Sequence, residues 1–251
     1  MRIARFSLNG EPRFGLVDGP ELIVLNGHPL VNGVEPTNDR VAIKDVKLLA
    51  PSIPSKVVCI GKNYSDHIVE MGLEPDPEPT VFFKPSSAII GPGDAIVLPP
   101  QSKQVELEVE LAVVIGKLTR NVSVDDAIDH IWGYTVANDV TARDLQFSDA
   151  QWARSKGFDT FCPLGPWIET EFIAEGQIIE SRINGEVAQA STVDQMIHGV
   201  AEIISYLSEN MTLLPGDVVL TGAPAGVRVI NKGDIVECEI EGVGNLFNPV
   251  V

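Results

Sequence analysis

Residues 105–117, VELEVELAVVIGK, constrain the fold of this chain more than any other segment. Glu106, Glu108 and Glu110 alternate with apolar residues, and this period of two predicts a β-strand with three carboxylates on one face. The following residues, 112–115, are all apolar, so the far half of the strand is expected to be buried. The strand therefore carries a row of acidic side chains into a hydrophobic core.

Three adjacent like charges on such a strand are costly unless another group neutralises them. A hard divalent cation such as Mg²⁺ or Mn²⁺ is the simplest candidate, because these ions prefer oxygen ligands. Residues on one face of a strand are roughly 6–7 Å apart, so two of the carboxylates can approach one ion. The alternative is a solvated edge strand with the glutamates on its outer face, and the segment alone does not decide between the two.

A third protein ligand is expected from elsewhere in the chain, and Asp139 is the leading candidate. It ends the segment 133–139, GYTVAND, which reads as an apolar strand, at a point where a charge has no packing role. The alternative for Asp139 is a turn or capping aspartate before Thr141.

Charge and composition exclude several classes of partner. The 251 residues carry a formal net charge of −17, which argues against nucleic acid and against an anionic membrane surface. An anionic substrate would need a local positive site. The cysteines, Cys59, Cys162 and Cys238, are widely spaced and suggest neither a disulfide framework nor a CxxC metal site. No signal-peptide core and no bilayer-spanning apolar run is present, so we expect a cytoplasmic protein.

The order of predicted elements indicates a strand-rich α+β fold, because strands dominate without regular βαβ alternation. Residues 1–48 read as a small N-terminal β subdomain, and residues 49–251 as the main domain. NYSDHIVEMG predicts a short helix with Gly72 as its C-cap, and PDPEP at 75–79 predicts a loop. Residues 192–210 have the clearest helical spacing.

Other candidate site residues have ordinary explanations as well as functional ones. His67 and Glu70 share a helix face, so the carboxylate can orient the imidazole as a general base for water, or the two can form an exposed pair without a role. Lys156 lies among aromatic residues and is a candidate for binding a substrate carboxylate or a polarised water, or a surface lysine. Thr221 and Gly222 end the strand VVLTG and form either a small anion-binding nest or a plain tight turn.

Five segments together resemble the fumarylacetoacetate hydrolase family: KNYSDHIVEMG, FFKPSSAIIGPGD, EVELAVVIGK, GYTVANDVTARDLQ and MTLLPGDVVLTGAPAGV. They occur in the family's order, and the resemblance covers about residues 49–251. The run RDLQFSDAQWARSKGFDTFCPLGPWIET is most similar to the bacterial oxaloacetate decarboxylase and acylpyruvate hydrolase-type members. The resemblance implies a mixed β-sandwich roll for the main domain.

The resemblance also implies roles for particular residues. The two-glutamate metal motif corresponds to Glu108 and Glu110, with Glu106 just before it, and the third metal ligand corresponds to Asp139. The catalytic histidine and glutamate correspond to His67 and Glu70, and the lysine beside the metal corresponds to Lys156. The substrate-binding residues implied are Arg143, Gln146 and Thr221, and Gly222 joins them as a candidate through the possible nest. The family's usual GTPxGVG turn is GAPAGVR here, with Ala223 and Arg228 as departures that leave the specificity for the far end of the substrate open.

The function implied is a divalent-metal-dependent enzyme, with Mg²⁺ or Mn²⁺, that cleaves a C–C bond in a small anionic 2-oxo or 2,4-dioxo acid through a metal-bound pyruvate enolate. Oxaloacetate would lose carbon dioxide without an attacking water, whereas an acylpyruvate would need water activated by His67 and Glu70. The alternatives are a 2-hydroxyhepta-2,4-diene-1,7-dioate isomerase or 5-oxopent-3-ene-1,2,5-tricarboxylate decarboxylase, and, in another class, an inactive metal-stabilised binding module. The resemblance further implies a homodimer.

Overall fold

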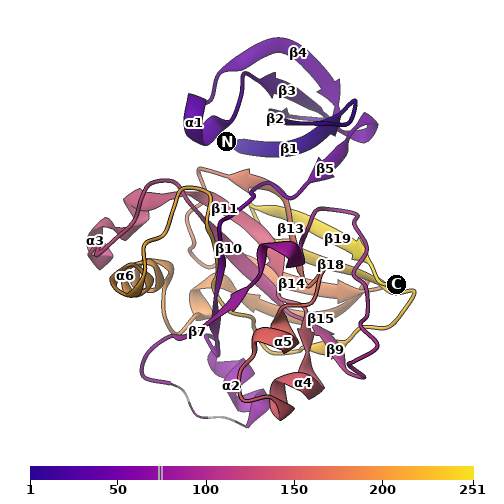
Figure 1. Ribbon diagram of the computed structural model, residues 1–251, viewed down its shortest axis with the longest axis vertical. Helices are drawn as coiled ribbons and strands as arrows, with labels where there is room; N and C mark the ends of the chain where they lie inside the picture. The colour runs from indigo at the N-terminus through magenta and orange to yellow at the C-terminus, as the bar shows by residue number, and fades with distance from the viewer. Residues whose placement is uncertain (73, 75) are drawn as a thin grey trace.

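The computed structural model describes residues 1–72, 74 and 76–251, and most of them belong to strands (Figure 1). The largest sheet contains β1 Arg2–Leu8, β2 Glu11–Asp18, β3 Glu21–Leu25, β4 Pro36–Ala42, β5 Lys47–Leu49, β6 Val57–Gly61, β7 Thr80–Lys84, β8 Ile89–Ile90, β10 Val109–Ile115, β11 Ile131–Asn138, β13 Cys162–Glu169 and β16 Val218–Leu220. Its order is β4-β3-β2-β1-β13-β11-β10-β16-β6-β7, with β5 beside β1 and β8 beside β13.

Two smaller sheets and several short helices complete the fold. A four-stranded sheet contains β14 Ile178–Ile183, β15 Glu186–Thr192, β18 Ile235–Ile240 and β19 Gly244–Pro249. A three-stranded sheet contains β9 Val105–Leu107, β12 Thr141–Ala142 and β17 Arg228–Val229. The α-helices are α1 Pro29–Asn32, α2 Ser65–Met71, α3 Val124–Ala127, α4 Arg143–Ser148, α5 Ala153–Lys156 and α6 Val200–Asn210, and 3₁₀ turns occupy Ile43–Asp45, Ser86–Ala88, Ile128–His130 and Val193–Gln195.

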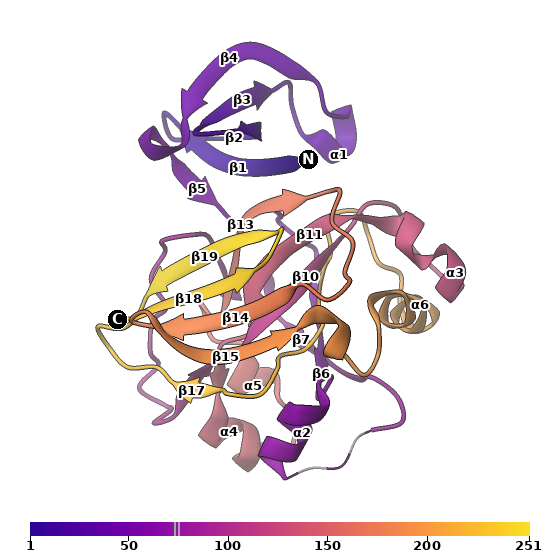
Figure 2. The same cartoon turned by 180° about the vertical axis from the view of Figure 1, so that it is seen from behind.

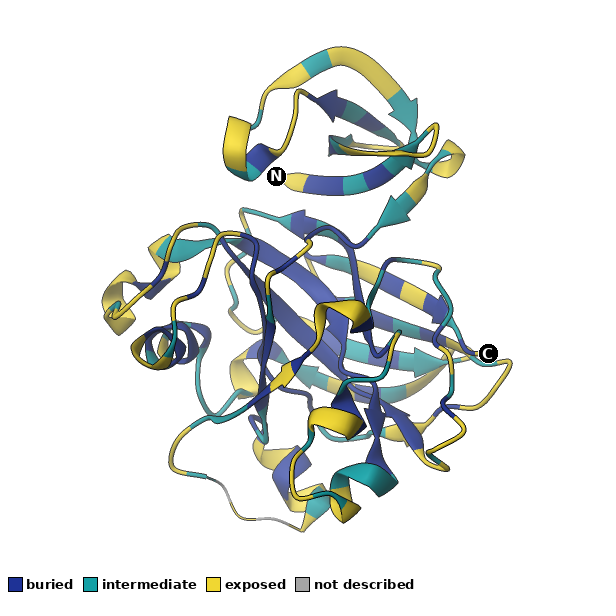
Figure 3. Cartoon of the chain, viewed as in Figure 1, coloured by how far each residue is buried: buried dark blue, intermediate teal, exposed yellow. Residues whose placement is uncertain are grey.

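Strand β10 lies at the centre of the molecule because both of its faces are covered (Figure 3). On one face, Val109, Leu111 and Val113 pack in a cluster with residues of the four-stranded sheet and of α6. On the other face, Ala112 and Val114 pack in a second cluster with residues of β6, β13 and β16. The large and four-stranded sheets therefore form the two layers of a sandwich (Figure 2), and the strand-rich α+β prediction is confirmed.

The large sheet is mixed, as expected from the resemblance, and the two smaller sheets are antiparallel. Strands β6 and β16 run parallel, and so do β8 and β13, whereas the other pairs of the large sheet are antiparallel. Helix α2 lies in the connection between the antiparallel neighbours β6 and β7, and α6 lies in the connection from β15 of the four-stranded sheet to β16 of the large one.

The N-terminal strands β1–β4 form a separate lobe in Figure 1 with a small apolar cluster of their own. They join the large sheet through β1, whose Arg2 and Ile3 pair with Glu169 and Ile168 of β13. The predicted boundary near residue 48 falls inside β5, which pairs with β1. The division into 1–48 and 49–251 stays a prediction.

The single strand predicted from residue 105 onward is wrong, because the strand is interrupted at Glu108. Side chains replace the sheet hydrogen bonds there: the Glu108 amide donates to Asn138 Oδ1 at 3.0 Å, and the Val109 amide donates to Gln189 Oε1 at 2.9 Å. Strand β9 consequently belongs to the three-stranded sheet and β10 to the large one. The solvated-edge alternative is also wrong, since β10 lies between β11 and β16.

The predicted helices are partly confirmed. Helix α2 forms, and Gly72 ends it in the left-handed conformation at φ +64°. Helix α6 begins at Val200, later than residue 192, because the preceding residues form a 3₁₀ turn after β15. In the predicted loop 75–79, residues 76–79 adopt neither helix nor strand, and Pro75 lies outside the described residues. Across the described residues, every helix is too short or too polar to traverse a bilayer.

Candidate active site

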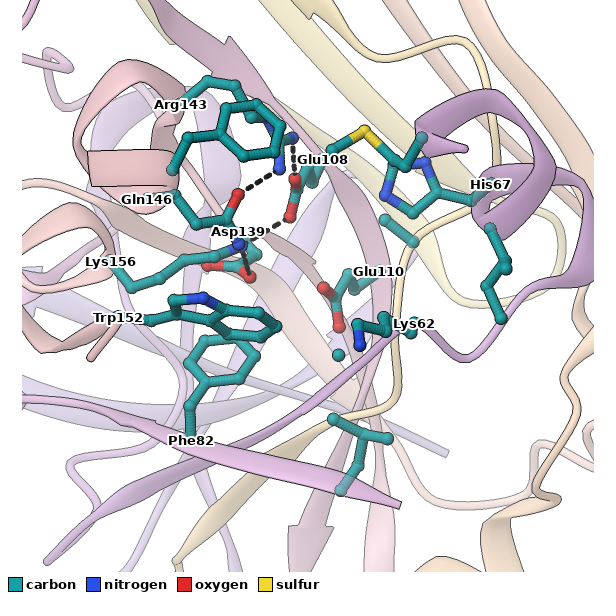
Figure 4. A pocket seen from close by; sticks show the side chains of 16 residues that line it. Lys62, His67, Phe82, Glu108, Glu110, Asp139, Arg143, Gln146, Trp152 and Lys156 are labelled. Atoms are coloured by element: carbon teal, nitrogen blue, oxygen red, sulfur yellow. Dashed lines mark hydrogen bonds and ion pairs between the residues drawn. The ribbon is translucent and has the colours of Figure 1, made fainter. Parts of the chain in front are cut away.

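A cavity of about 220 Å³ lies where the loop after β6, helices α2, α4 and α5, and strands β7 and β10 meet (Figure 4). Its polar lining residues are Lys62, His67, Glu108, Glu110, Asp139, Arg143, Gln146 and Lys156. Apolar walls come from Phe82, Trp152, Ile60, Ile68, Met71, Phe147 and Ala223. Ordinary drug-sized ligand pockets are larger, so this cavity suits a small molecule.

The three carboxylates predicted as metal ligands meet in this cavity. Glu108, Glu110 and Asp139 each offer one oxygen, and these oxygens lie within 4.8 Å of one another. The break at Glu108 and the position of Asp139 directly after β11 bring them together, since the Asp139 amide donates to the Glu108 carbonyl at 2.8 Å. The capping explanation for Asp139 is not what the structure shows, because its carboxylate faces lysines instead.

Two cations hold the Glu108 carboxylate. Lys156 Nζ donates to Glu108 Oε2 at 2.7 Å and to Asp139 Oδ2 at 2.5 Å. Arg143 donates from Nη2 to Glu108 Oε1, from Nε to Glu106 Oε2 at 2.7 Å, and from Nη1 to Gln146. Burial alone would raise the pKa of Glu108, but Lys156 and Arg143 outweigh it and lower that pKa. Lys156 is buried, so its reading as a surface lysine is wrong.

Lys84, at the end of β7, is a buried cation that the sequence reading missed. Its Nζ lies 2.6 Å from Asp139 Oδ1 and donates hydrogen bonds to the carbonyls of Val140, Lys156 and Phe161 at 3.0, 2.6 and 2.7 Å. Asp139 Oδ1 therefore receives charge attraction but no aligned hydrogen bond. The lysine of FFKPSS follows an apolar strand directly, and that position was the available signal.

Among the described residues, Glu110 is the carboxylate of the three that forms no ion pair. Its Oε2 accepts a hydrogen bond from the Gly222 amide at 2.6 Å, and its residue is 1% exposed. Burial, together with the negative charges of Asp139 and Glu108, holds the pKa of Glu110 well above its ordinary value. This carboxylate is therefore the part of the cluster that most needs a further positive charge.

The nest expected at Thr221 and Gly222 is not free to bind an anion from solution. The Gly222 amide is used by Glu110, and the Thr221 hydroxyl donates to the Leu111 carbonyl at 3.0 Å. Thr221 is fully buried, and neither residue lines the cavity. These contacts support Glu110 and β10, and the expected substrate contact of the two residues stays a prediction.

His67 and Glu70 form the expected pair on α2. His67 lines the cavity, and its Nδ1 lies 3.1 Å from Glu70 Oε2, which leaves Nε2 for other partners. Glu70 is itself held by the Gly226 amide, which lies 3.1 and 3.2 Å from its two oxygens. Only half of the pair is exposed: His67 is buried and lines the cavity, whereas Glu70 is exposed.

The donor set fits a hard divalent cation. Buried carboxylate oxygens are the ligands that Mg²⁺ and Mn²⁺ prefer, and Asp139 Oδ1 lacks a hydrogen bond. The buried cluster holds four carboxylates, of Glu106, Glu108, Glu110 and Asp139, against three cations, Lys84, Arg143 and Lys156. With all four carboxylates ionised its net charge is one negative, and a dication, on displacing any proton from Glu110, would make it one positive.

Ala223 and Arg228, the two residues that differ from the family's usual GTPxGVG turn, lie in different environments. Ala223 lines the cavity, so its small side chain leaves room there. Arg228 lies in β17 and is exposed, away from the cavity lining. Ala223 is therefore the departure that bears on the site.

Comparison with known proteins agrees with this architecture. The family description "Fumarylacetoacetate (FAA) hydrolase C-terminal" matches residues 56–251, and "Rv2993c-like, N-terminal" matches residues 1–51. Protein Rv2993c of Mycobacterium tuberculosis is 52% identical over 212 residues, which cover 83% of this chain and 80% of that protein.

Two further relatives have names that state an activity. The mitochondrial oxaloacetate tautomerase FAHD2A of Bos taurus is 47% identical over 220 residues, covering 82% of this chain and 70% of that protein. The crystal structure of 2-hydroxyhepta-2,4-diene-1,7-dioate isomerase from Mycobacterium marinum is 44% identical, with a TM-score of 0.93 over 100% of this chain and 98% of that one. The chain therefore belongs to the fumarylacetoacetate hydrolase family, whose members include isomerases and tautomerases.

Proposed function

We propose that this chain is an enzyme that moves protons at the carbon next to the keto group of a small 2-oxo acid, interconverting its keto and enol forms. The observation that carries the proposal is the position of His67, which faces three convergent carboxylates across one small cavity (Figure 4). The name of the FAHD2A relative, an oxaloacetate tautomerase, supports oxaloacetate as the first substrate to test.

Glu108, Glu110 and Asp139 would hold Mg²⁺ or Mn²⁺. When bound, the ion would supply Lewis acidity toward the keto and carboxylate oxygens of the acid. Lys156 and Arg143 fix the ligand oxygens of Glu108, and Lys84 and Lys156 fix Asp139. The apolar walls formed by Phe82 and Trp152 exclude water from the reacting carbon.

His67 would carry the proton. With Nδ1 bound to Glu70, Nε2 is the ring atom left to take a proton from the carbon next to the keto group and to return it. Glu70 stabilises the ring while it holds the extra proton, and the Gly226 amide keeps Glu70 in place. In the enol the proton lost by the carbon is carried by the former keto oxygen, and in the reverse direction the carbon regains a proton as the oxygen loses one, so the reaction is balanced without a further reactant.

Cleavage of a C–C bond is the second candidate, and the same His67–Glu70 pair favours it because it could instead activate water for an acylpyruvate. Oxaloacetate decarboxylation would not need that water. The cavity volume of about 220 Å³ favours short acids such as oxaloacetate over long acyl chains.

One set of assays tests both candidates. Oxaloacetate, acetylpyruvate and fumarylpyruvate are supplied with Mg²⁺ or Mn²⁺, and enol absorbance and pyruvate release are followed separately. We expect keto–enol exchange of oxaloacetate to be faster with the protein than without it. Pyruvate should be released only if the chain also cleaves C–C bonds. His67→Ala should abolish exchange and acylpyruvate hydrolysis but spare much of the decarboxylation, whereas His130→Ala, outside the cavity, should change neither.

Two outcomes would contradict the proposal. Unchanged exchange in His67→Ala would remove His67 as the proton carrier. Mn²⁺ binding without turnover of any of the three acids would instead favour the inactive, metal-stabilised binding module.

A further inference from the structure

Lys62 is a cavity residue whose charge is not used inside the cavity. Among the described lining residues, Arg143 and Lys156 are committed to buried carboxylates. Lys62 Nζ pairs instead with Asp76 Oδ2 at 3.0 Å, and the two side chains are 24% and 40% exposed. Such a solvent-exposed ion pair is weak, so a ligand in the cavity can compete for Lys62.

The backbone of Lys62 is held in a conformation that a lysine rarely adopts. Its φ is +57°, in the left-handed region, where a residue with a side chain is strained. The next residue, Asn63, fixes this turn: its Nδ2 donates to the carbonyls of Thr221 and His198 at 2.7 and 3.0 Å, and its Oδ1 accepts from the His198 amide at 2.8 Å. Strain maintained in this way is typical of functional positions.

The position and the charge balance indicate what Lys62 would bind. In Figure 4, Lys62 and His67 lie on one side of the cavity, and Lys156, Gln146 and Trp152 lie on the other. The buried cluster would carry one positive charge with a dication and none once the carboxylate at the keto end of a substrate is bound. A second substrate carboxylate would then need a cation of its own.

We propose that Lys62 binds the far carboxylate of a dicarboxylic 2-oxo acid and thereby makes the site prefer dicarboxylates to monocarboxylates. This inference rests on the proposed function, because it requires the keto end of the substrate at Glu108, Glu110 and Asp139. The substrate carboxylate replaces Asp76 as the partner of Lys62. The new ion pair lies nearer to the apolar walls of Phe82 and Trp152, where attraction between charges is stronger than in water.

Binding of unreactive analogues to the Mn²⁺-loaded protein tests the proposal. (S)-Malate and (S)-lactate share the 2-hydroxy acid end and differ in the second carboxylate, and their dissociation constants are measured by calorimetry. Lys62→Met should weaken malate binding roughly tenfold or more and leave lactate binding unchanged, since a hydrogen bond between charged groups is lost. Lys62→Arg should retain part of the malate preference, and Asp76→Asn should strengthen malate binding.

Lys117→Met is the matched control, because Lys117 is exposed and outside the cavity, and it should change neither constant. An equal loss of malate and lactate affinity in Lys62→Met, or a loss of Mn²⁺ affinity, would overturn the proposal and make Lys62 a support for the carboxylate cluster. Unchanged malate binding would overturn it too. If the unsubstituted protein binds neither acid and turns over no 2-oxo acid, the proposed function itself fails, and this inference fails with it.

Discussion

The carboxylates of Glu108, Glu110 and Asp139 occupy one cavity but have different partners. Glu108 is bound by Arg143 and Lys156, and Asp139 by Lys84 and Lys156. Glu110 has the Gly222 amide. Burial and the two neighbouring carboxylates therefore outweigh the opposing effects of Lys156 and of the Gly222 amide on Glu110, and its pKa rises above the ordinary 4.5.

This raised pKa makes metal binding dependent on pH. Metal-free folded protein keeps the Glu110 proton above pH 4.5, whereas unfolded chains lose it, so the free energy of unfolding falls as the pH rises toward the folded-state pKa. A dication must displace that proton, so Mn²⁺ affinity and the Mn²⁺-induced rise in Tm should both increase from mildly acidic to mildly alkaline pH. Calorimetry in buffers of different ionisation enthalpy counts the released proton.

Glu110→Gln is the control for this prediction. The amide cannot ionise, so proton release should disappear and Mn²⁺ binding should weaken at every pH. If the unsubstituted protein binds Mn²⁺ with the same affinity at mildly acidic and at mildly alkaline pH, Glu110 is not a metal ligand.

Lys84 should be as important for folding as for the site. Lys84→Met leaves the Asp139 carboxylate and three backbone carbonyls without their buried cation, so we expect a loss of about 3–5 kcal/mol in unfolding free energy. Denaturant unfolding of metal-free protein measures the loss. Arg154→Met, which breaks an exposed pair with Asp149, should have little effect. Equal free energies of unfolding for Lys84→Met and Arg154→Met would contradict the stabilising role of Lys84.

At the scale of the element, the interruption between β9 and β10 organises the site. A continuous strand would have kept Glu106, Glu108 and Glu110 on one face, as the alternation predicted. Instead, the side-chain oxygens of Asn138 and Gln189 accept hydrogen bonds from the two backbone amides at the break. The Glu106 carboxylate accepts hydrogen bonds from Arg143 and Gln104. The break thus selects two of the three glutamates for the cavity.

The turn after β16 is the second element that supports the site. Gly222 has φ +104°, and a Cβ there would lie 2.6 Å from Asn63 Cβ. Gly222→Ala should cost on the order of 1–3 kcal/mol in unfolding free energy and weaken Mn²⁺ binding, because the amide moves away from Glu110. Thermal unfolding and Mn²⁺ titration measure the two effects.

Gly233→Ala is a matched control for that turn. Gly233 has a similar φ of +96°, but a Cβ there would meet no atom within 4 Å. Gly233→Ala should therefore lower the free energy of unfolding, because alanine is strained in this backbone conformation, and leave Mn²⁺ affinity unchanged. An equal loss of Mn²⁺ affinity in both variants would remove the Gly222 amide from the site.

At the scale of the whole molecule, the net charge of −17 contrasts with a cavity that contains most of the chain's buried cations. Lys84, Arg143 and Lys156 are each at most 3% exposed, so water and salt screen their charges little. The proposed anionic substrate would therefore meet a local positive field inside an acidic molecule, once a dication balances the buried carboxylates.

The family resemblance also predicts a homodimer. Light scattering on the purified protein should give a mass twice that of one chain at micromolar concentration. A mass of one chain across the accessible concentration range would contradict this prediction.

The sequence alone determined the fold class and the residues of the acidic cluster, because alternation and apolar runs report which side chains must be buried. The assignment of His67, Glu70 and Lys156 to one site came from the resemblance of short motifs to the family, since their local patterns alone left ordinary explanations open. Only the tertiary structure decided that the strand breaks at Glu108, that Lys84 pairs with Asp139, and that the Gly222 amide donates a hydrogen bond to Glu110. Lys84 and Asp139 are 55 residues apart and Gly222 and Glu110 are 112 apart, and no local pattern records which distant partner a buried charge finds.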